Sequence, residues 1–521
     1  MLRRVGAALE PWWSRLLLLV IVGDVLAGIA LRFRTTSKLW LDEALSVNIA
    51  RHGLSGIVGL LRHDGAPPLY YFMLHFWMTA VGTSDIAVRS LSGACGVAAV
   101  VVMYLAARDA WDAQRARLVA AIGSVLPFTV YYSTETRMYS LVVLEVALLA
   151  LLLVKLQRQP TSRAVLLGIS LTVASLLYTQ YWSIYLVASL GAVASFQWLR
   201  QPSKRRELRS QVATYLLGCL LWLPWLPIFN SQRLHTGTPW ARHPQPFQFI
   251  IWPVGMWVNQ SVQHVSSSLH FALLSLAMVI VMTLGVFAVV GRNEQGILLK
   301  IRPEGEISFY ATVGAIAIFL GMLACDISDS AYAPRYSSIV AVLFVFVIAR
   351  GLATFGTPQR VFLALALLSV LLLWTDKWGI GVQRTQAGVA ARAIAAAGDG
   401  SRSLIAVCPD QIGPSLSRYV GGNPQYVLYP RLDTNPRIVD WYDYPAALAG
   451  TTPEKAAEAV ARRLKPHQTL YVAWATGYTL KSTCETFAND LRKVTHRQPT
   501  TLVVQNMVGY YQSMTLVRLP G

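Results

Sequence analysis

The chain has 521 residues, of which 54% are hydrophobic and only 14% are charged, and its formal net charge is +19 at pH 7. Repeated apolar runs of about twenty residues indicate an integral membrane protein. Lys and Arg cluster in short loops between these runs, where the positive-inside rule and anionic lipid account for them, so we expect membrane lipid and no nucleic acid among the partners.

The first predicted element is a membrane span at 14–33. Its apolar core is long and lacks a clear small-residue cleavage site, so we expect a retained helix and not a signal peptide. With the N-terminus inside, the loop 34–85 that follows faces the extracytoplasmic side. Within it, residues 54–61 have the spacing of a surface helix, and the apolar run 69–81 is only about thirteen residues long, so both should lie at the interface.

Two adjacent carboxylates, Asp42 and Glu43, stand near the start of this loop in the sequence LWLDEA. An ionised carboxylate at the membrane interface is suited to act as a general base on an acceptor hydroxyl within hydrogen-bond reach. The structural alternative is that Asp42 is the N-cap of the helix that follows. Position alone leaves both interpretations open.

The same loop contains RHDGAPPLYYF, in which two prolines favour the first turn of the next helix. We predict that His63, Asp64 and Tyr70 line a substrate cavity. An ordinary turn and an aromatic belt at the interface are the alternative. His63 and Asp64 are also compatible with a divalent metal, but two neighbouring ligands are a weak pattern, so we predict no definite cofactor and no metal ligands.

Ten further spans are predicted, near 86–107, 118–134, 135–154, 164–182, 183–199, 212–229, 269–291, 307–324, 337–353 and 361–375. The total is about eleven transmembrane helices, several of them short. The hairpins that then face inward, including 200–211, hold two to five Lys or Arg residues each, whereas the outward turns hold one or none. This difference supports the topology and places the loop 230–268 outside.

Ionisable residues mark two of the outward turns, YYSTETRMYSL and APRYSSI. At this depth such residues usually face a cavity or one another. We predict that Glu135 and Tyr139 line the substrate cavity, and that Arg137, Arg335 and Tyr336 bind a donor phosphate, because the planar guanidinium grips phosphate with two donors. The alternatives are a structural pair of Glu135 with Arg137 and an interfacial anchor at Arg335.

The sequence pattern of residues 376–521 differs from that of the apolar runs before it. Short β-rich runs, SLIAVCP, QYVLYP, TLYVAWA, TLVVQNM and MTLVRL, alternate with helical stretches such as TPEKAAEAVARRL and CETFANDLRKV. This pattern predicts an extracytoplasmic α/β domain of strands and crossover helices. No Gly-rich phosphate loop opens its helices, so we expect no nucleotide site there. Spacing alone does not decide whether Cys408 and Cys484 form a disulfide.

Seven motifs in order resemble the bacterial branch of the protein O-mannosyltransferase and aminoarabinose-transferase superfamily, which has the GT-C type of fold. They are LWLDEA, HDGAPPLYYFMLHFW, AVRSLSGACGVAAVVVMYLAAR, PFTVYYSTETRMYSL, YTQYWSIYLVAS, LLWLPWLPIF and APRYSSI. The resemblance covers about residues 14 to 350 and does not include the C-terminal domain. It implies a polytopic α-helical catalytic domain at 1–375, whereas the α/β domain at 376–521 is predicted from its own sequence pattern.

The resemblance also implies a function. Such an enzyme takes a sugar, here of mannose or arabinose type, from a polyprenyl-phosphate donor and transfers it, usually with inversion, to an extracytoplasmic acceptor in the cell envelope, a glycan, a lipid or a protein. In the family the acidic pair of the first loop contains the catalytic carboxylate, which corresponds to Asp42 with Glu43 beside it. Many relatives have a His directly before the two prolines; this chain reads HDGAPPL, so the family assigns no secure role to His63.

Two other classes of protein compete with this interpretation. A transporter or lipid flippase of the plasma membrane would also have many spans and buried charges, but would favour broken helices in paired positions and an internal repeat, which the sequence does not show. A scaffold that only displays the C-terminal domain would need neither the acidic pair nor Arg335.

Overall fold

The computed structural model describes residues 2–236, 245, 248–257, 268–293, 296–301, 305–328, 332–398, 402–478, 480 and 482–521. The chain forms two compact units. The first comprises Met1–Thr35, Arg89–Leu226 and His243–Ile380, and the second comprises Thr36–Val88, Pro227–Arg242 and Gly381–Gly521. About half of the predicted outer loop 230–268 lies outside the described residues, namely 237–244, 246–247 and 258–267.

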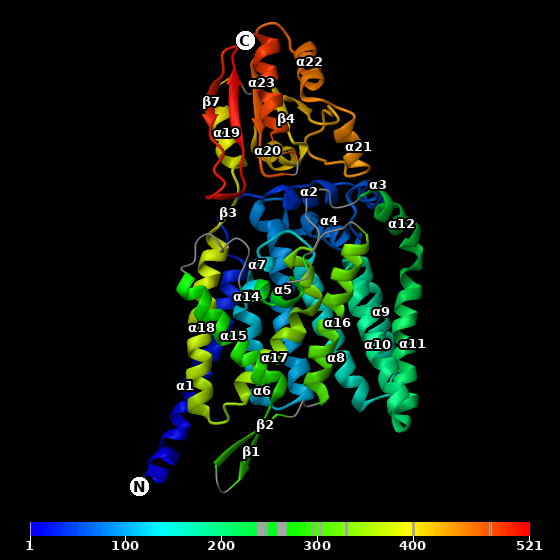
Figure 1. Cartoon of the computed structure of the whole chain (residues 1–521), viewed down its shortest axis with the longest axis vertical. Coiled ribbons are helices and arrows are strands. Elements are labelled where there is room, and N and C mark those ends of the chain that lie inside the picture. Colours follow the sequence, from blue (N-terminus) through cyan, green and yellow to red (C-terminus); the bar gives the residue numbers. More distant parts are fainter. Residues whose placement is uncertain are drawn as a thin grey trace. The chain divides into compact units, whose positions relative to one another are not determined.

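The first unit is a bundle of helices, most of them long and apolar (Figure 1). In chain order they are α1 (Leu2–Arg32), α5 (Asp85–Ala110), α6 (Ala113–Val125), α7 (Pro127–Ser133), α8 (Tyr139–Arg158), α9 (Arg163–Thr179), α10 (Ser183–Arg200), α11 (Arg205–Trp222), α13 (Gln248–Ile251), α14 (Val254–Trp257), α15 (Ser268–Phe287), α16 (Gly305–Ile327), α17 (Ala341–Ala353) and α18 (Pro358–Gly381). Almost all of α17 is buried, because α6, α15 and α16 pack around it. A short antiparallel hairpin, β1 (Ala288–Asn293) with β2 (Gly296–Ile301), joins α15 to α16.

Eight helical segments of the described chain are long and apolar enough to cross a membrane, which confirms a multi-pass membrane protein. Of the eleven predicted spans, 118–134, 164–182 and 183–199 form shorter or less apolar helices. The first of these is divided between α6 and α7. Leu126 is extended, with φ −69° and ψ 121°, because it precedes Pro127, and the residue before a proline is disfavoured in the helical region.

Buried polar side chains connect neighbouring helices of the bundle. Arg32, at the end of α1, is 2% exposed and donates to the carbonyl oxygens of Gly123 and Ser124 at 2.8 and 2.6 Å. A cation in this position satisfies carbonyls that the last turn of α6 leaves unpaired. Glu145 of α8 accepts a hydrogen bond from Thr179 of α9 at 2.8 Å. Such bonds hold helices together where lipid offers no polar partner.

Glycines allow α15 and α17 to approach closely. A Cβ atom built on Gly351 would lie 1.9 Å from the carbonyl oxygen of Val281, and one on Gly285 would lie 2.2 Å from that of Val347. Neither position therefore has room for a larger side chain, as is usual where membrane helices pack backbone to backbone.

The second unit combines short helices with an α/β domain. The helices are α2 (Leu41–Ala50), α3 (Leu54–Asp64), α4 (Leu69–Val81) and α12 (Leu226–His235), and the α/β domain contains β3 (Gln383–Thr385), α19 (Ala387–Ala396), β4 (Leu404–Cys408), α20 (Gly413–Tyr419), β5 (Gln425–Leu428), α21 (Tyr444–Ala449), α22 (Pro453–Arg463), β6 (Leu470–Trp474), α23 (Thr483–Thr495), β7 (Thr500–Val503), β8 (Tyr510–Gln512) and β9 (Thr515–Leu519). The helix predicted from the spacing of residues 54–61 is confirmed as α3, and the two prolines immediately precede α4.

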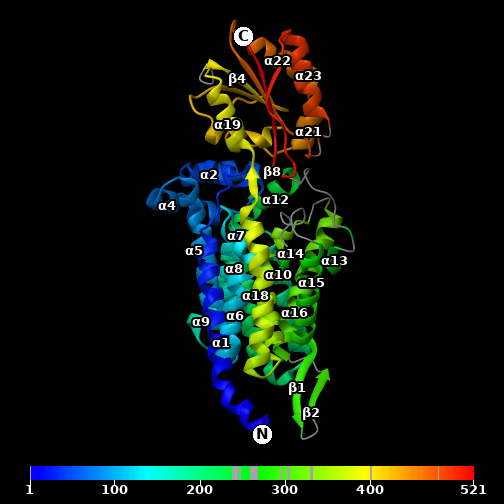
Figure 2. The ribbon, with the colours of Figure 1, turned by 90° about the vertical axis from the view of Figure 1, so that its left-hand side faces the viewer.

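All five strands predicted in the C-terminal region belong to one sheet, with the order β5-β4-β6-β9-β7. Strand β4 is parallel to β5 and β6, whereas β9 is antiparallel to β6 and β7. Helices α19 and α20 cover one face of the sheet and α22 and α23 the other (Figure 2). The predicted α/β domain is therefore confirmed, with a small parallel pair of β3 and β8 added to it.

Candidate functional site

Helix α2 contains the acidic pair in its first turn. Trp40 is the N-cap residue and its side chain makes no capping bond, so the interpretation of Asp42 as an N-cap is wrong. Asp42 is partly exposed, whereas the side chain of Glu43 is 0% exposed. A carboxylate in the first turn is favoured by the helix dipole. Of the two acids, Asp42 is thus the one that a substrate can reach.

Glu43 forms an ion pair with Arg384 of β3, with 3.4 Å between Oε1 and Nη1. Both side chains are buried, at 0% and 2% exposure. Buried charges require such a partner, because either one alone would lose its hydration without compensation. Sequence reasoning missed Arg384, since nothing around it indicates a partner 341 positions away.

A polar cluster lies where β4 and β6 end. Gln512 Oε1 accepts hydrogen bonds from the Leu41 amide at 3.2 Å and from Ser415 at 2.8 Å, and its Nε2 donates to the Tyr478 hydroxyl at 3.4 Å. Burial raises the pKa of that hydroxyl most, and the Asp42 and Asp410 carboxyl groups raise it further. The carboxyl ends of parallel strands are where α/β sheets commonly bind ligands.

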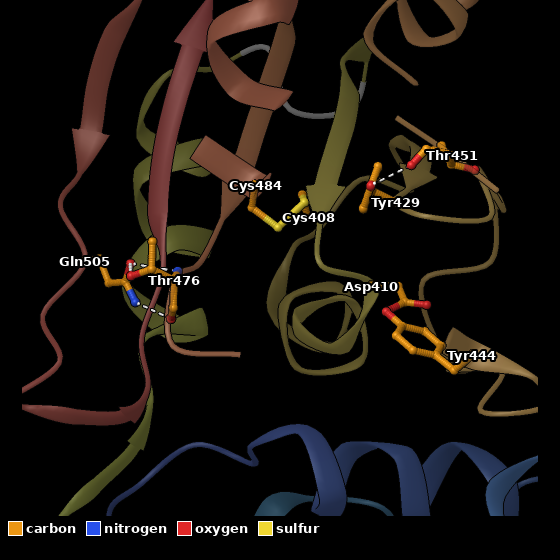
Figure 3. Close-up of a disulfide and its surroundings, with 8 residues drawn as sticks. All are labelled: Cys408, Asp410, Tyr429, Tyr444, Thr451, Thr476, Cys484 and Gln505. Atoms are coloured by element: carbon orange, nitrogen blue, oxygen red, sulfur yellow. Dashed lines mark hydrogen bonds between the residues drawn. A yellow bond between two sulfur atoms is a disulfide. The ribbon is translucent and has the colours of Figure 1, made fainter. Parts of the chain in front are cut away.

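Asp410, the second carboxyl group of this cluster, is buried and accepts a hydrogen bond from the Tyr444 hydroxyl at 2.6 Å (Figure 3). Burial raises the pKa of Asp410 from 3.8 to about 7, an effect that the bond from Tyr444 partly opposes. Asp410 therefore exchanges a proton near neutral pH, which ordinary aspartates do not.

Figure 3 also shows the disulfide between Cys408, at the end of β4, and Cys484 of α23. Their Cα atoms are 5.3 Å apart, and both side chains are fully buried. The pairing that spacing left open is thus present in the structure. It ties the sheet to the helix that covers it.

The residues predicted around the two prolines take separate partners. The Nδ1 atom of His63 lies 2.8 Å from Oδ1 of Asp440, and Asp64 accepts a hydrogen bond from Tyr71 at 3.0 Å. Tyr70 is fully buried. Across the described ranges no group of three or more His, Cys, Asp or Glu side chains is arranged to hold a metal ion.

Tyr139, one of the predicted residues of the first unit, packs against Tyr132 of α7, which sequence reasoning missed. The ring centroids of Tyr132 and Tyr139 are 5.0 Å apart. Glu135 is 2% exposed. The only sequence indication of Tyr132 is that it belongs to the motif YYSTETRMYSL.

The two remaining residues predicted to bind phosphate are fixed by other contacts within this unit. The carbonyl oxygen of Arg137 accepts a hydrogen bond from Ser92 at 3.2 Å. The ring of Tyr336 stacks on Trp182, with centroids 5.2 Å apart and an angle of 23° between the planes. The guanidinium of Arg335 lies 5.8 Å from the centroid of the Tyr336 ring. Asp42, Glu43, His63, Asp64 and Tyr70 all belong to the second unit.

Comparison with known proteins identifies the fold. Residues 65–228 match the sequence profile of the family described as dolichyl-phosphate-mannose-protein mannosyltransferase. Among curated proteins, no sequence is significantly similar to the chain. The structure is similar to ArnT from Cupriavidus metallidurans bound to undecaprenyl phosphate, with a TM-score of 0.58 and 12% identity over 96% of this chain and 97% of ArnT. ArnT in the apo state gives a TM-score of 0.52 over the same shares, again at 12% identity.

The structural likeness covers nearly the whole chain, including the C-terminal domain that the sequence motifs did not reach. The sequence match covers the segment that begins just before the two prolines and ends in α12. Together they favour a transferase over a transporter. The chain is a multi-pass membrane protein with the fold of GT-C-type glycosyltransferases.

Proposed function

We propose that the protein transfers a sugar from a polyprenyl-phosphate donor to an acceptor of the cell envelope on the extracytoplasmic side, with inversion. The match of residues 65–228 to a family of dolichyl-phosphate-mannose-dependent transferases is the observation that carries this proposal. ArnT, whose fold the chain shares, binds undecaprenyl phosphate in its crystal structure, which supports a polyprenyl phosphate as the carrier. The sugar is of mannose or arabinose type.

In this proposal Asp42 is the general base. An acceptor hydroxyl attacks the anomeric carbon of the sugar as its proton passes to the Asp42 carboxylate. The bond between the anomeric carbon and the phosphate oxygen breaks, and polyprenyl phosphate leaves with the bonding electrons. The partial exposure of Asp42 in the first turn of α2 supports this role, because a base must lie within hydrogen-bond reach of its substrate.

Arg137 and Arg335 hold the donor phosphate, with Tyr336 as an additional hydroxyl donor. The leaving phosphate gains negative charge during transfer, and a guanidinium stays protonated and offers paired donors to it. Glu135 and Tyr139 of the first unit contribute to substrate binding, and so do His63, Asp64 and Tyr70 of the second unit. In support, the guanidinium of Arg335 lies 5.8 Å from the centroid of the Tyr336 ring, so these two residues are neighbours in the first unit. Substituting Lys for Arg335 should weaken donor affinity clearly, whereas an anchoring role alone would leave that affinity unchanged.

The second unit faces the extracytoplasmic side in this proposal. The distribution of Lys and Arg supports this orientation, as does the disulfide of Cys408 with Cys484, because disulfides persist in oxidising compartments. A membrane-impermeant thiol reagent should label Lys455→Cys in intact cells, and should label Ser203→Cys only after the membrane is opened. The reverse result would invert the topology.

The test of the proposed function is transfer from a radiolabelled polyprenyl-phosphate sugar by membranes that contain the wild-type protein, Asp42→Asn or Asp443→Asn. Loss of a positioned base lowers turnover by roughly a hundredfold or more, so Asp42→Asn should lose at least that much while still folding. Asp443 is an exposed aspartate of the same unit, paired with His235, and serves as the matched control. Near-normal transfer by Asp42→Asn would exclude it as the base, and transport without transfer would favour a flippase.

A further inference from the structure

Helix α2 is held at its N-terminus by the C-terminal domain. The contacts within the second unit are the Leu39 amide donating to the Tyr419 hydroxyl at 2.7 Å, the Leu41 amide donating to Gln512 Oε1 at 3.2 Å, and the ion pair of Glu43 with Arg384 at 3.4 Å. The first amides of a helix have no partner within it, and Trp40 at the N-cap supplies none. Gln512 therefore supplies the bond that a local cap usually makes.

Arg384 and Gln512 belong to neighbouring strands. Strand β3 pairs in parallel with β8, with Gln383 opposite Tyr510 and Thr385 opposite Gln512. The backbone amide of Arg384 also donates to Ser37 Oγ at 2.7 Å. Arg384 and Gln512, whose side chains contact the first turn of α2, thus lie on two paired strands. The distance between their backbones is therefore fixed.

The ion pair is one of the contacts that set the rotation of α2 about its axis, together with the packing of its other buried residues. Successive residues of an α-helix point about 100° apart, because the helix has about 3.6 residues per turn. Moving the charged Glu43 away from Arg384 would break a buried ion pair, which is strongly unfavourable. Holding Glu43 against Arg384 therefore keeps Asp42 on the accessible side of the helix.

We propose that Arg384 is a positioning residue for sugar transfer: it binds Glu43, fixes the rotation of α2, and so aims the Asp42 carboxylate at the acceptor hydroxyl. Glu43 is then a positioning residue as well and does not touch the substrate. This inference rests on the proposed function, because it takes Asp42 as the base. It gives the C-terminal domain a direct part in the reaction.

The experiment compares wild-type protein with Arg384→Gln, Arg384→Lys and the double variant Glu43→Gln/Arg384→Gln, purified in detergent. Turnover is measured per folded molecule together with the donor KM, and backbone hydrogen exchange is followed over residues 41–50. The double variant removes both charges, so it should fold even if Arg384→Gln alone leaves Glu43 too unstable. Arg497→Gln is the matched control, since that guanidinium contacts the Gln468 carbonyl oxygen inside the C-terminal domain.

Misplacing a reacting group by about an ångström lowers the rate by up to roughly a hundredfold, so Arg384→Gln and the double variant should lose roughly tenfold to a hundredfold in turnover. Their donor KM should change less than about twofold, because in this proposal the donor is held by other residues. Arg384→Lys should recover most of the loss, since it keeps the charge. Backbone hydrogen exchange over residues 41–50 should be faster in every variant that lacks the ion pair. Arg497→Gln should change neither turnover nor this exchange.

Wild-type turnover per folded molecule in the double variant would overturn the inference, because the ion pair would then serve stability alone. Unchanged hydrogen exchange over 41–50 in that variant would overturn it as well. If the wild-type protein transfers no sugar, the proposed function fails, yet the exchange measurement still decides whether Arg384 orders α2. The two failures are therefore distinguishable.

Discussion

Removing the disulfide should strongly destabilise the C-terminal domain. Cys408 and Cys484 are 76 positions apart in sequence, and a cross-link that closes a loop of this length stabilises the folded state by about 4.5 kcal/mol in the chain-entropy treatment. Domains have only about 5–15 kcal/mol of net stability, so Cys408→Ala/Cys484→Ala should lose a large fraction of it. The new alanines lie among Val460, Phe487 and Leu491 and leave small voids, which add to the loss.

Hydrogen exchange of the β4 and β6 amides measures this loss in the full-length protein, because these strands are central and should exchange only when the sheet opens. The double variant and wild-type protein treated with a reductant should exchange alike, and both much faster than oxidised wild-type protein. Cys219→Ser, which changes a free cysteine of the membrane bundle, should leave the sheet unaffected. Free thiols at 408 and 484 in protein from intact cells, or exchange that does not respond to reductant, would refute the reasoning.

Three further predictions concern stability. The pKa of Asp410 is about 7 in the folded state, against an ordinary value of 3.8. Between these two pH values the folded protein binds more protons than the unfolded protein. The stability that Asp410 contributes at low pH is therefore lost as the pH rises through 7. Asp410→Asn should abolish this part of the decline in thermal unfolding measured from about pH 5 to about pH 8, and an unchanged slope would contradict the assignment. Gly351→Ala should destabilise the bundle by about 1–3 kcal/mol through overpacking, whereas Gly191→Ala, where a Cβ meets nothing within 4 Å, should be neutral or stabilising in the same thermal assay. Thr452→Ala removes the oxygen that accepts from the Lys455 amide at the start of α22, so exchange there should increase by the equivalent of about 1 kcal/mol, and Thr452→Ser should restore it.

The sequence predicted the elements whose hydrophobic pattern is strong and local. Runs such as SLIAVCP and TLYVAWA became β4 and β6 because several consecutive apolar residues are buried on both faces of the sheet. Strands β3 and β8 have three residues each, too few for any period to appear. The run 118–134 looked continuous because hydropathy alone does not show the break that Pro127 makes.

The candidate site was predictable only in part. The acidic pair was visible as charge in an apolar setting, but the different burial of Asp42 and Glu43 depends on Arg384, which is 341 positions from Glu43. No motif in the sequence singles out Asp410, and its raised pKa arises from burial that only the folded sheet provides. Contacts between distant segments of this kind leave no periodic trace in a sequence.

The hydrogen bond from Leu41 to Gln512 joins residues 471 positions apart. At about 5–20 residues added per second, a ribosome needs roughly half a minute to a minute and a half to make that stretch. During this interval the helix that contains Asp42 has already been synthesised, but the residue that holds its first turn does not yet exist. The helix can reach its final orientation only after the C-terminal domain has been synthesised and folded. A newly inserted molecule should therefore gain activity with the slow kinetics of domain maturation and not with the faster kinetics of membrane insertion.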